Sequence, residues 1–109
     1  INLWKQIAAR YANETIIAGY DLLNEPIPTP KDSLVKMYQR IIAAIRTVDA
    51  NHMVVLEGAN FAKDFSMFKT IPDKNMMFSF HIYTWLGGEP ADKMKDFAEL
   101  SLMPLLRIT

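Results

Sequence analysis

Two short segments carry polar side chains that could exchange protons. Asn24-Glu25-Pro26 directly follows one apolar run, and His81-Ile82-Tyr83 ends another. Carboxyl and imidazole groups are the side chains that most often act as general acids and bases. Glu57 follows a third apolar run. If the three runs are neighbouring parallel strands, these side chains should gather at one edge of the sheet, where functional residues collect in such folds.

Each of these residues also has an ordinary structural explanation. A glutamate before a proline most often lies in a solvated turn, and His81 could be a hydrogen-bonded core histidine. Tyr83 could merely cover a strand end, and Glu57 could serve only to position its neighbours. His52 looks like a loop residue before a strand. His52 and His81 do not have metal-ligand spacing, so the sequence indicates neither a metal ion nor another cofactor.

Three apolar runs, partly β-branched or aromatic, are predicted to be strands. They cover residues 15–23, 53–56 and 76–83. Side chains alternate along a strand, so Ser79, His81 and Tyr83 share one face of the third strand, while Phe78, Phe80 and Ile82 share the other. The polar face suits a site, and the apolar face suits packing against helices.

Helical patterns alternate with these strands. Amphipathic spacing predicts helices over 2–13 and from Pro30 to Val48, where Pro30 suits the first helical position and Thr29 can cap the helix. Residues 91–102 also look helical. Residues 59–74 look irregular, with one helical turn at most and with Phe61, Phe65, Met67 and Phe68 as apolar anchors.

This alternation predicts an α/β fold with parallel strands and right-handed crossovers. Either an open doubly wound sheet or part of a (β/α)8 barrel would satisfy it. A complete barrel needs about 250 residues, and the chain has 109. On the barrel interpretation, about the middle third to two-fifths of the barrel is present.

Composition narrows the class of partner. Twelve basic residues balance twelve acidic ones, which argues against nucleic acid or an anionic membrane surface. The chain has no cysteine, so disulfides and thiolate metal sites are excluded. No apolar run approaches the roughly 20 residues that span a bilayer.

The segment from Gly19 to Pro26 resembles the strand-four signature of glycoside hydrolase family 5, the cellulase family of (β/α)8 barrels. Ile45-Arg46 with Asp49, and then Met53 to Gly58, look like that family's helix four and strand five. His81-Ile82-Tyr83 resembles its strand-six motif. The resemblance runs from Leu3 to about residue 100, and it implies a partial TIM barrel. Residues 1–109 would then be an internal fragment of one catalytic domain, from about strand four to helix six.

The resemblance also implies roles. Glu25 would be the acid/base of a retaining, double-displacement mechanism, and Asn24 would bind the sugar 2-hydroxyl. Tyr83 would hold the nucleophile, His81 would line the adjacent subsite, and Trp85 could stack on a pyranose ring or simply pack. The implied partner is a β-linked oligo- or polysaccharide, most simply a β-1,4-glucan cleaved internally, although glucan and mannan remain open. A secreted location is favoured by the same resemblance.

The family's nucleophile is a glutamate at the end of strand seven, and no such residue is evident. After Tyr83 the glutamates are Glu89, in a Gly/Pro loop, and Glu99, in a helical pattern. We therefore expect these 109 residues alone to be inactive. Open sheet edges would also favour self-association.

Two other classes of protein fit parts of the pattern. A noncatalytic half-barrel for carbohydrate binding or assembly would keep the aromatic residues and make no use of Glu25. An unrelated open α/β domain would bind a small ligand at its strand ends. The absence of a Gly-rich phosphate loop after any predicted strand argues against a nucleotide.

Overall fold

The computed structural model describes residues 1–27, 30–70 and 72–81. Six elements lie in this part of the chain, and they alternate between helix and strand. They are α1 (Asn2–Tyr11), β1 (Gly19–Asp21), α2 (Lys31–Arg46), β2 (Met53–Glu57), α3 (Ala59–Ala62) and β3 (Met76–Ser79). The helix predicted over 91–102, together with Tyr83 and Trp85, lies outside the described residues.

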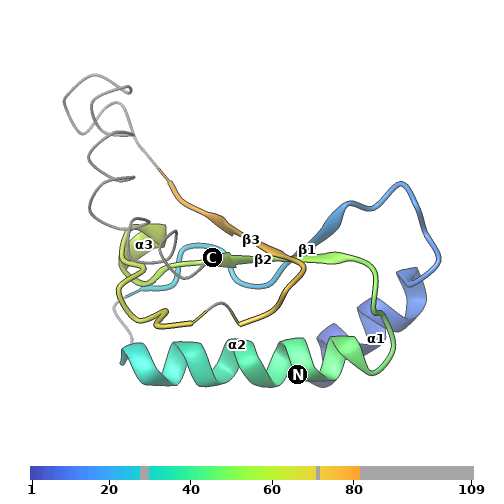
Figure 1. Ribbon diagram of the computed structural model, residues 1–109, viewed down its shortest axis with the longest axis horizontal. Helices are drawn as coiled ribbons and strands as arrows, with labels where there is room; N and C mark the ends of the chain where they lie inside the picture. The colour runs from blue at the N-terminus through green and yellow to red at the C-terminus, as the bar shows by residue number, and fades with distance from the viewer. Residues whose placement is uncertain (28–29, 71, 82–109) are drawn as a thin grey trace.

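The three strands form one parallel sheet in the order β1-β2-β3. In the register, Tyr20 pairs with Val54, and Leu56 pairs with Phe78. The strands run side by side, and their carboxyl ends point toward α3 (Figure 1). The prediction of adjacent parallel strands is therefore confirmed, and the residues that follow the three strands are brought to one edge.

The strand predicted over 15–23 was too long at both ends. Hydrogen bonds from Glu14 N to Tyr11 O and from Ile17 N to Glu14 O fold the preceding residues into turns. Ile16 is consequently 90% exposed. Ladder bonding begins with Met53 N donating to Ala18 O and ends with Leu22 N donating to Val55 O. An apolar composition alone did not distinguish this turn from strand.

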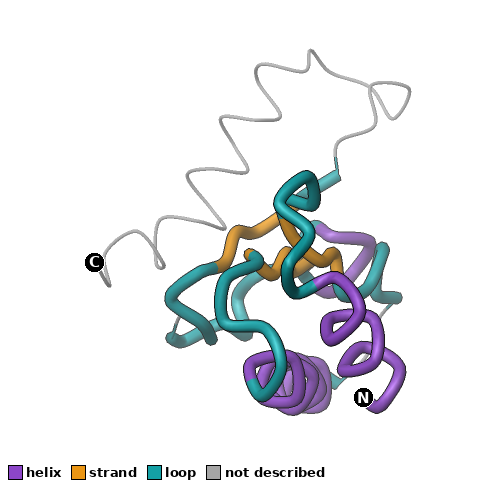
Figure 2. The backbone as a smooth tube through the Cα atoms, turned by 90° about the vertical axis from the view of Figure 1, so that its right-hand side faces the viewer, coloured by secondary structure: helices purple, strands orange, loops and turns teal. Residues whose placement is uncertain are grey.

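One face of the sheet is covered by helices. Along α2 a stripe of side chains with helical spacing is buried, namely Leu34, Tyr38, Ile41, Ile42 and Ile45. From the strands, Tyr20, Val54 and Leu56 join the same core. Both long helices lie on this side of the sheet, as the end view in Figure 2 shows. The helix predicted from Pro30 begins one residue later, with Pro30 as its N-cap.

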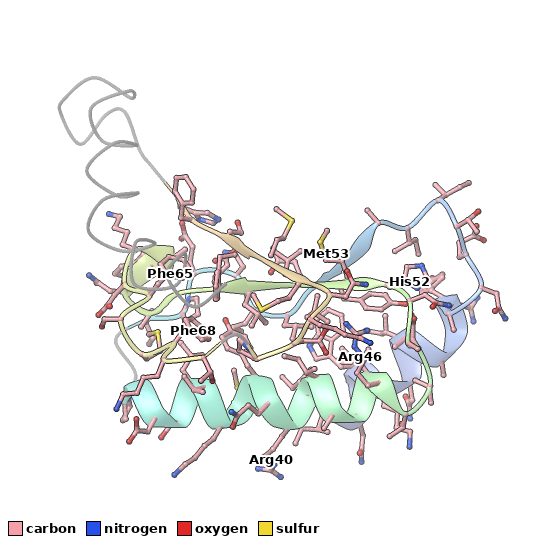
Figure 3. All side chains as sticks on the ribbon, viewed as in Figure 1. Arg40, Arg46, His52, Met53, Phe65 and Phe68 are labelled. Atoms are coloured by element: carbon pink, nitrogen blue, oxygen red, sulfur yellow. The ribbon has the colours of Figure 1, made fainter. Side chains whose placement is uncertain are left out.

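An aromatic cluster anchors the irregular segment between β2 and β3. Phe65 and Phe68 are buried at the α3 end of the molecule (Figure 3). Phe78 of β3 contacts both, with ring centroids 5.3 Å from Phe65 and 4.8 Å from Phe68. The predicted anchors are confirmed for Phe65, Met67 and Phe68, whereas Phe61 is 43% exposed.

A buried polar network occupies the opposite end of the sheet, where the strands begin. Asp49 accepts hydrogen bonds from the Tyr20 hydroxyl at 2.6 Å and from the backbone N–H groups of Asn51 and His52. His52 lies in the loop before β2, as predicted, and its ring contacts Asp49 Oδ2 at 2.6 Å and Glu14 O at 3.0 Å. This network joins the turn after α1, strand β1 and the loop between α2 and β2. Among the described helices, none combines the length and apolar character needed to cross a bilayer.

Candidate functional site

Three titratable side chains meet where the three strands end. Glu25 follows β1, Glu57 is the last residue of β2, and His81 follows β3. The His81 ring contacts Glu25 Oε1 through Nδ1 at 2.6 Å and Glu57 Oε1 through Nε2 at 3.2 Å. The third side of the cluster is a hydrogen bond from the backbone N–H of Glu25 to Glu57 Oε2, at 2.6 Å. The sequence predicted that Glu25 and His81 would converge, and the structure brings them into contact.

The members of the cluster differ in their access to solvent. The side chains of His81 and Glu25 are 26% and 25% exposed, whereas that of Glu57 is 1% exposed. A reactant could therefore reach Glu25 and His81 directly. Glu57 can act only through the residues it touches.

Glu25 has an uncommon backbone conformation. Its φ is 46°, in the left-handed region that residues other than glycine seldom adopt. A residue before proline is normally extended, so the sequence Glu25-Pro26 did not predict this. The bond from its N–H to the Glu57 carboxylate holds the conformation in place. Strained backbone of this kind is concentrated at functional sites, where surrounding contacts maintain it.

Glu57 is itself fixed from below the sheet. The buried hydroxyl of Tyr38, in α2, donates a hydrogen bond to the Glu57 backbone oxygen at 2.9 Å. The carboxylate that contacts Glu25 and His81 is therefore attached to a backbone position that the helix layer restrains.

The short α3 turn closes the rim of the site. Asn60, Phe61 and Ala62 all have positive φ. A hydrogen bond from Phe61 N to Pro26 O at 2.9 Å joins the turn to the segment after β1, and one from His81 N to Ala62 O at 3.4 Å joins it to the segment after β3. It thus holds the segments that carry Glu25 and His81 at a fixed separation.

Hydrogen bonding and charge favour a proton on His81. The contact with Glu25 raises the pKa of His81 above its usual value, and the negative charges of Glu57, Glu25 and Asp21 act in the same direction against the effect of burial. An imidazole between two carboxyl groups can hold and transfer a proton near neutral pH. The chemistry that the cluster can perform is general acid and base catalysis.

The other predicted site residues are placed less fully. Asn24 is exposed on the same rim, directly before Glu25. Tyr83 and Trp85 lie outside the described residues. Within the described residues, no group of three or more acidic or histidine side chains is arranged to hold a metal ion.

The sequence placed Glu57 at the same edge of the sheet as Glu25 and His81 but gave it no catalytic or binding role. The available signal was its position, because it stands at the end of a buried strand between the two strands that precede Glu25 and His81. Its burial and its contacts could not be read from that position.

A family model matches nearly the whole chain. The model described as Cellulase (glycosyl hydrolase family 5) matches residues 1–99. Among curated proteins, a β-xylosidase of Phanerodontia chrysosporium is 39% identical over 87 residues, which cover 78% of this chain and 18% of that protein. Endoglucanase C of Acetivibrio thermocellus is 26% identical over 85 residues, covering 76% of this chain and 25% of that protein. The chain thus spans a quarter or less of the length of these relatives.

Solved structures show the same fold. The crystal structure of a β-glucanase from Saccharophagus degradans in complex with cellotetraose has a TM-score of 0.73 at 24% identity, covering 91% of this chain and 32% of that one. Endoglucanase Cel5A of Thermotoga maritima has a TM-score of 0.67 at 21% identity, covering 89% of this chain and 42% of that one. These similarities confirm the predicted fold class, a partial (β/α)8 barrel.

Proposed function

Because the chain belongs to glycosyl hydrolase family 5, the cellulase family, we propose that it carries the acid/base residue, Glu25, of a retaining β-glycoside hydrolase. The observation that supports this most directly is the 2.6 Å contact between Glu25 Oε1 and His81 Nδ1 at a rim open to solvent. This contact gives an exposed carboxyl group a neighbour that can exchange a proton with it. Residues 1–109 would all belong to one catalytic domain.

In the proposed mechanism Glu25 acts twice. It first donates its proton to the departing glycosidic oxygen while a second carboxylate, about 5 Å away, attacks the anomeric carbon. It then removes a proton from the water that hydrolyses the glycosyl-enzyme. His81 borders Glu25 and would keep its carboxyl group oriented toward the scissile bond.

Glu57 does not meet the requirements of the nucleophile. Its side chain is 1% exposed, and its two oxygens face the Glu25 N–H and the His81 ring. An anomeric carbon could not approach either oxygen without breaking these contacts. We propose that the nucleophile is contributed from outside this chain.

The proposed substrate is a β-linked glucan, cleaved internally. Two named relatives are an endoglucanase and a β-glucanase bound to cellotetraose, whereas the 39% identical protein is named a β-xylosidase. A glucan and a xylan are therefore the two backbones to compare. We propose that Asn24 binds the sugar 2-hydroxyl, that Tyr83 holds the nucleophilic carboxylate in place, and that Trp85 stacks on a sugar ring.

The first test uses the longest polypeptide that the gene encodes around these residues. Hydrolysis of cellotetraose and xylotetraose is followed by proton NMR, which shows the anomer released first. We expect β-glucoside cleavage with retention, and we expect Glu25→Gln to reduce turnover by about 10²- to 10⁴-fold, the usual contribution of general acid–base catalysis. The matched control is Glu14→Gln, because Glu14 is exposed and lies at the other end of the sheet. This substitution should leave turnover unchanged.

A second measurement separates an acid/base from any other essential carboxylate. With a dinitrophenyl cellobioside, whose leaving group needs no proton, Glu25→Ala should still form the glycosyl-enzyme. Added azide should then accelerate turnover and yield a β-glycosyl azide. Release of the α-anomer, or binding of cello-oligosaccharides without turnover by an intact polypeptide, would refute the proposal, and the latter would indicate a noncatalytic binding module.

A further inference from the structure

We propose that Glu57 is a positioning residue, which fixes the tautomer of His81 and thereby keeps the acid proton between His81 and Glu25. The inference rests on the proposed role of Glu25, and it adds a function for a buried carboxylate that does not contact substrate. The geometry of the three side chains carries it.

The first step concerns the outer nitrogen of the His81 ring. Nε2 faces Glu57 Oε1 at 3.2 Å, and the other oxygen of Glu57 accepts the Glu25 N–H at 2.6 Å. A carboxylate offers only acceptors. This contact is an ion pair rather than a hydrogen bond, and the negative charge of Glu57 favours a hydrogen on the ring nitrogen that faces it.

The second step concerns the inner nitrogen. Nδ1 lies 2.6 Å from Glu25 Oε1, a separation that requires one proton between the two atoms. With Nε2 already protonated, that proton belongs either to Glu25 beside a neutral ring or to an imidazolium beside a carboxylate. In both cases the pair holds the proton that the first chemical step needs.

The third step is the state that Glu57 disfavours. A neutral ring protonated at Nδ1 could donate to an ionised Glu25, and the pair would then have one proton fewer. This state leaves Nε2 bare against Glu57, so the buried carboxylate opposes it. Glu57 therefore extends to higher pH the range over which Glu25 can act as an acid.

Glu57 also fixes the backbone position of Glu25, the proposed acid. Its Oε2 holds the Glu25 N–H, and with it the left-handed backbone at φ 46°. Its main-chain oxygen is held by Tyr38. The other carboxylate whose charge acts on His81 is Asp21 of β1, which is exposed.

The substitution Glu57→Gln gives a sharp prediction. The amide oxygen must face the Glu25 N–H, which leaves the amide NH₂ facing Nε2. Since an NH₂ group donates, it should draw the neutral His81 ring into the opposite tautomer, protonated at Nδ1. Loss of the negative charge should also lower the His81 titration midpoint by about one pH unit or more.

The experiment is a pH titration of the 109-residue chain, labelled with ¹⁵N and followed by long-range proton–nitrogen correlation of the imidazole rings. The His52→Asn variant lacks the His52 ring signals, so the signals that remain belong to His81. In the unsubstituted chain we expect the neutral His81 ring to carry its hydrogen on Nε2, and in Glu57→Gln on Nδ1. Asp21→Asn removes a charge without touching the ring, so it should produce a smaller change in midpoint and the same tautomer as the unsubstituted chain.

Two outcomes would overturn the inference. One is a neutral His81 protonated at Nδ1 in the unsubstituted chain, a measurement that stands even if Glu57→Gln does not fold. The other is a Glu57→Gln midpoint that moves no further than that of Asp21→Asn. Neither measurement involves substrate, so each is independent of whether the hydrolase proposal holds.

A kinetic measurement on the longer polypeptide adds a readout that a merely structural role would not change. Glu57→Gln should move the alkaline limb of the kcat/KM profile to lower pH, because the acid proton is lost earlier. A purely structural defect would lower kcat/KM by the same factor at every pH.

Discussion

His52 and His81 show how the same side chain serves two purposes in one small sheet. Each ring has both nitrogens against oxygen atoms: Glu25 and Glu57 for His81, and Asp49 and the Glu14 carbonyl for His52. The His81 side chain is 26% exposed, whereas that of His52 is 8% exposed. The open histidine can take part in proton transfer, and the enclosed one can only contribute to stability.

The enclosed histidine should make stability depend on pH. The bond to the Glu14 carbonyl and the contact with Asp49 raise the pKa of His52, because only an imidazolium can donate to both acceptors. A raised pKa stabilises the fold below the unfolded value of about 6.5, and this stabilisation is lost as pH rises through the folded value. Urea unfolding at pH 6 and pH 8 should show a lower free energy of unfolding at pH 8.

The contribution of His52 can be separated from that of His81, whose pKa is also raised. His52→Asn should flatten the pH dependence, while His81→Asn should leave the part due to His52. Asp49 does not interfere in this range: burial acts to raise its pKa, but hydrogen bonds from the His52 backbone and from Tyr20 outweigh that effect and lower it to about 2. An unchanged slope in His52→Asn would contradict the assignment.

Single residues were predictable where position decides their role. Glu25 and His81 follow apolar strands, and parallel pairing alone places such residues together. The contacts of Glu57 were not predictable, since glutamates at strand ends also occur facing solvent. The left-handed backbone of Glu25 ran against the rule for residues before proline, and it depends on a carboxylate 32 positions later in the chain.

At the scale of elements, Arg46 connects the end of α2 to the approach to β3. Its guanidinium binds both oxygens of Asp73, through Nε at 3.0 Å and Nη2 at 2.9 Å. Nη1 donates to the backbone oxygens of Asp49 and His52. One planar side chain thus fixes the segments on either side of β2.

Lysine cannot reproduce that set of bonds, because it lacks the planar fork. Arg46→Lys should lower the free energy of unfolding by about 1–3 kcal/mol, the scale of losing charge-assisted hydrogen bonds at a partly buried site. Arg40→Lys is the control, since Arg40 lies on the same helix and points away from the sheet (Figure 3). It should change stability by less than about 0.5 kcal/mol. Equal effects of the two substitutions would contradict this account of Arg46.

Elements were predictable to the extent that their pattern is periodic. The buried stripe of α2 repeats over about three turns, and the helix was located to within two residues at its end. The short β1 was overestimated because Thr15 and Ile16 are as β-branched as strand residues but form turns that expose them. The α3 turn, with its positive φ values, has no sequence signature, since none of its residues is glycine.

At the scale of the whole molecule, the two long helices cover one face of the sheet, and none of the described helices lies over the other, which we call the uncovered face. Within the described residues, both long helices lie on the same side (Figure 1). Val55 and Met77 pair on the other side, and Met77 is 47% exposed. In the barrel to which this fold corresponds, that side is the interior.

The chain of 109 residues should be inactive by itself. Retention needs two carboxylates about 5 Å apart, and the neighbour of Glu25 in the described residues, Glu57, is enclosed and held by other contacts. No release of nitrophenol from a nitrophenyl cellobioside is expected above the buffer rate. Turnover that is abolished by Glu25→Gln would show that a second carboxylate is present after all.

The uncovered face and open strand edges should make this chain associate with itself. Sedimentation velocity should show species larger than a monomer as concentration rises. Met77→Lys places a charge on the uncovered face and should shift the distribution toward monomer. Leu3→Lys, which removes an exposed apolar side chain from α1, is the control. If both variants shift the distribution equally, general surface hydrophobicity rather than the sheet is responsible.

The hydrogen bond from Tyr38 to the backbone of Glu57 has a consequence for natural variation. Tyr38, a buried helix residue, holds the backbone of Glu57, whose carboxylate accepts the Glu25 N–H. If Glu57 acts as proposed, changes in the packing between α2 and β2 would shift the pH range over which Glu25 acts as an acid. The residues that contact substrate would not need to change. Related enzymes adapted to acidic or alkaline habitats could therefore differ beneath the sheet and share an identical cleft.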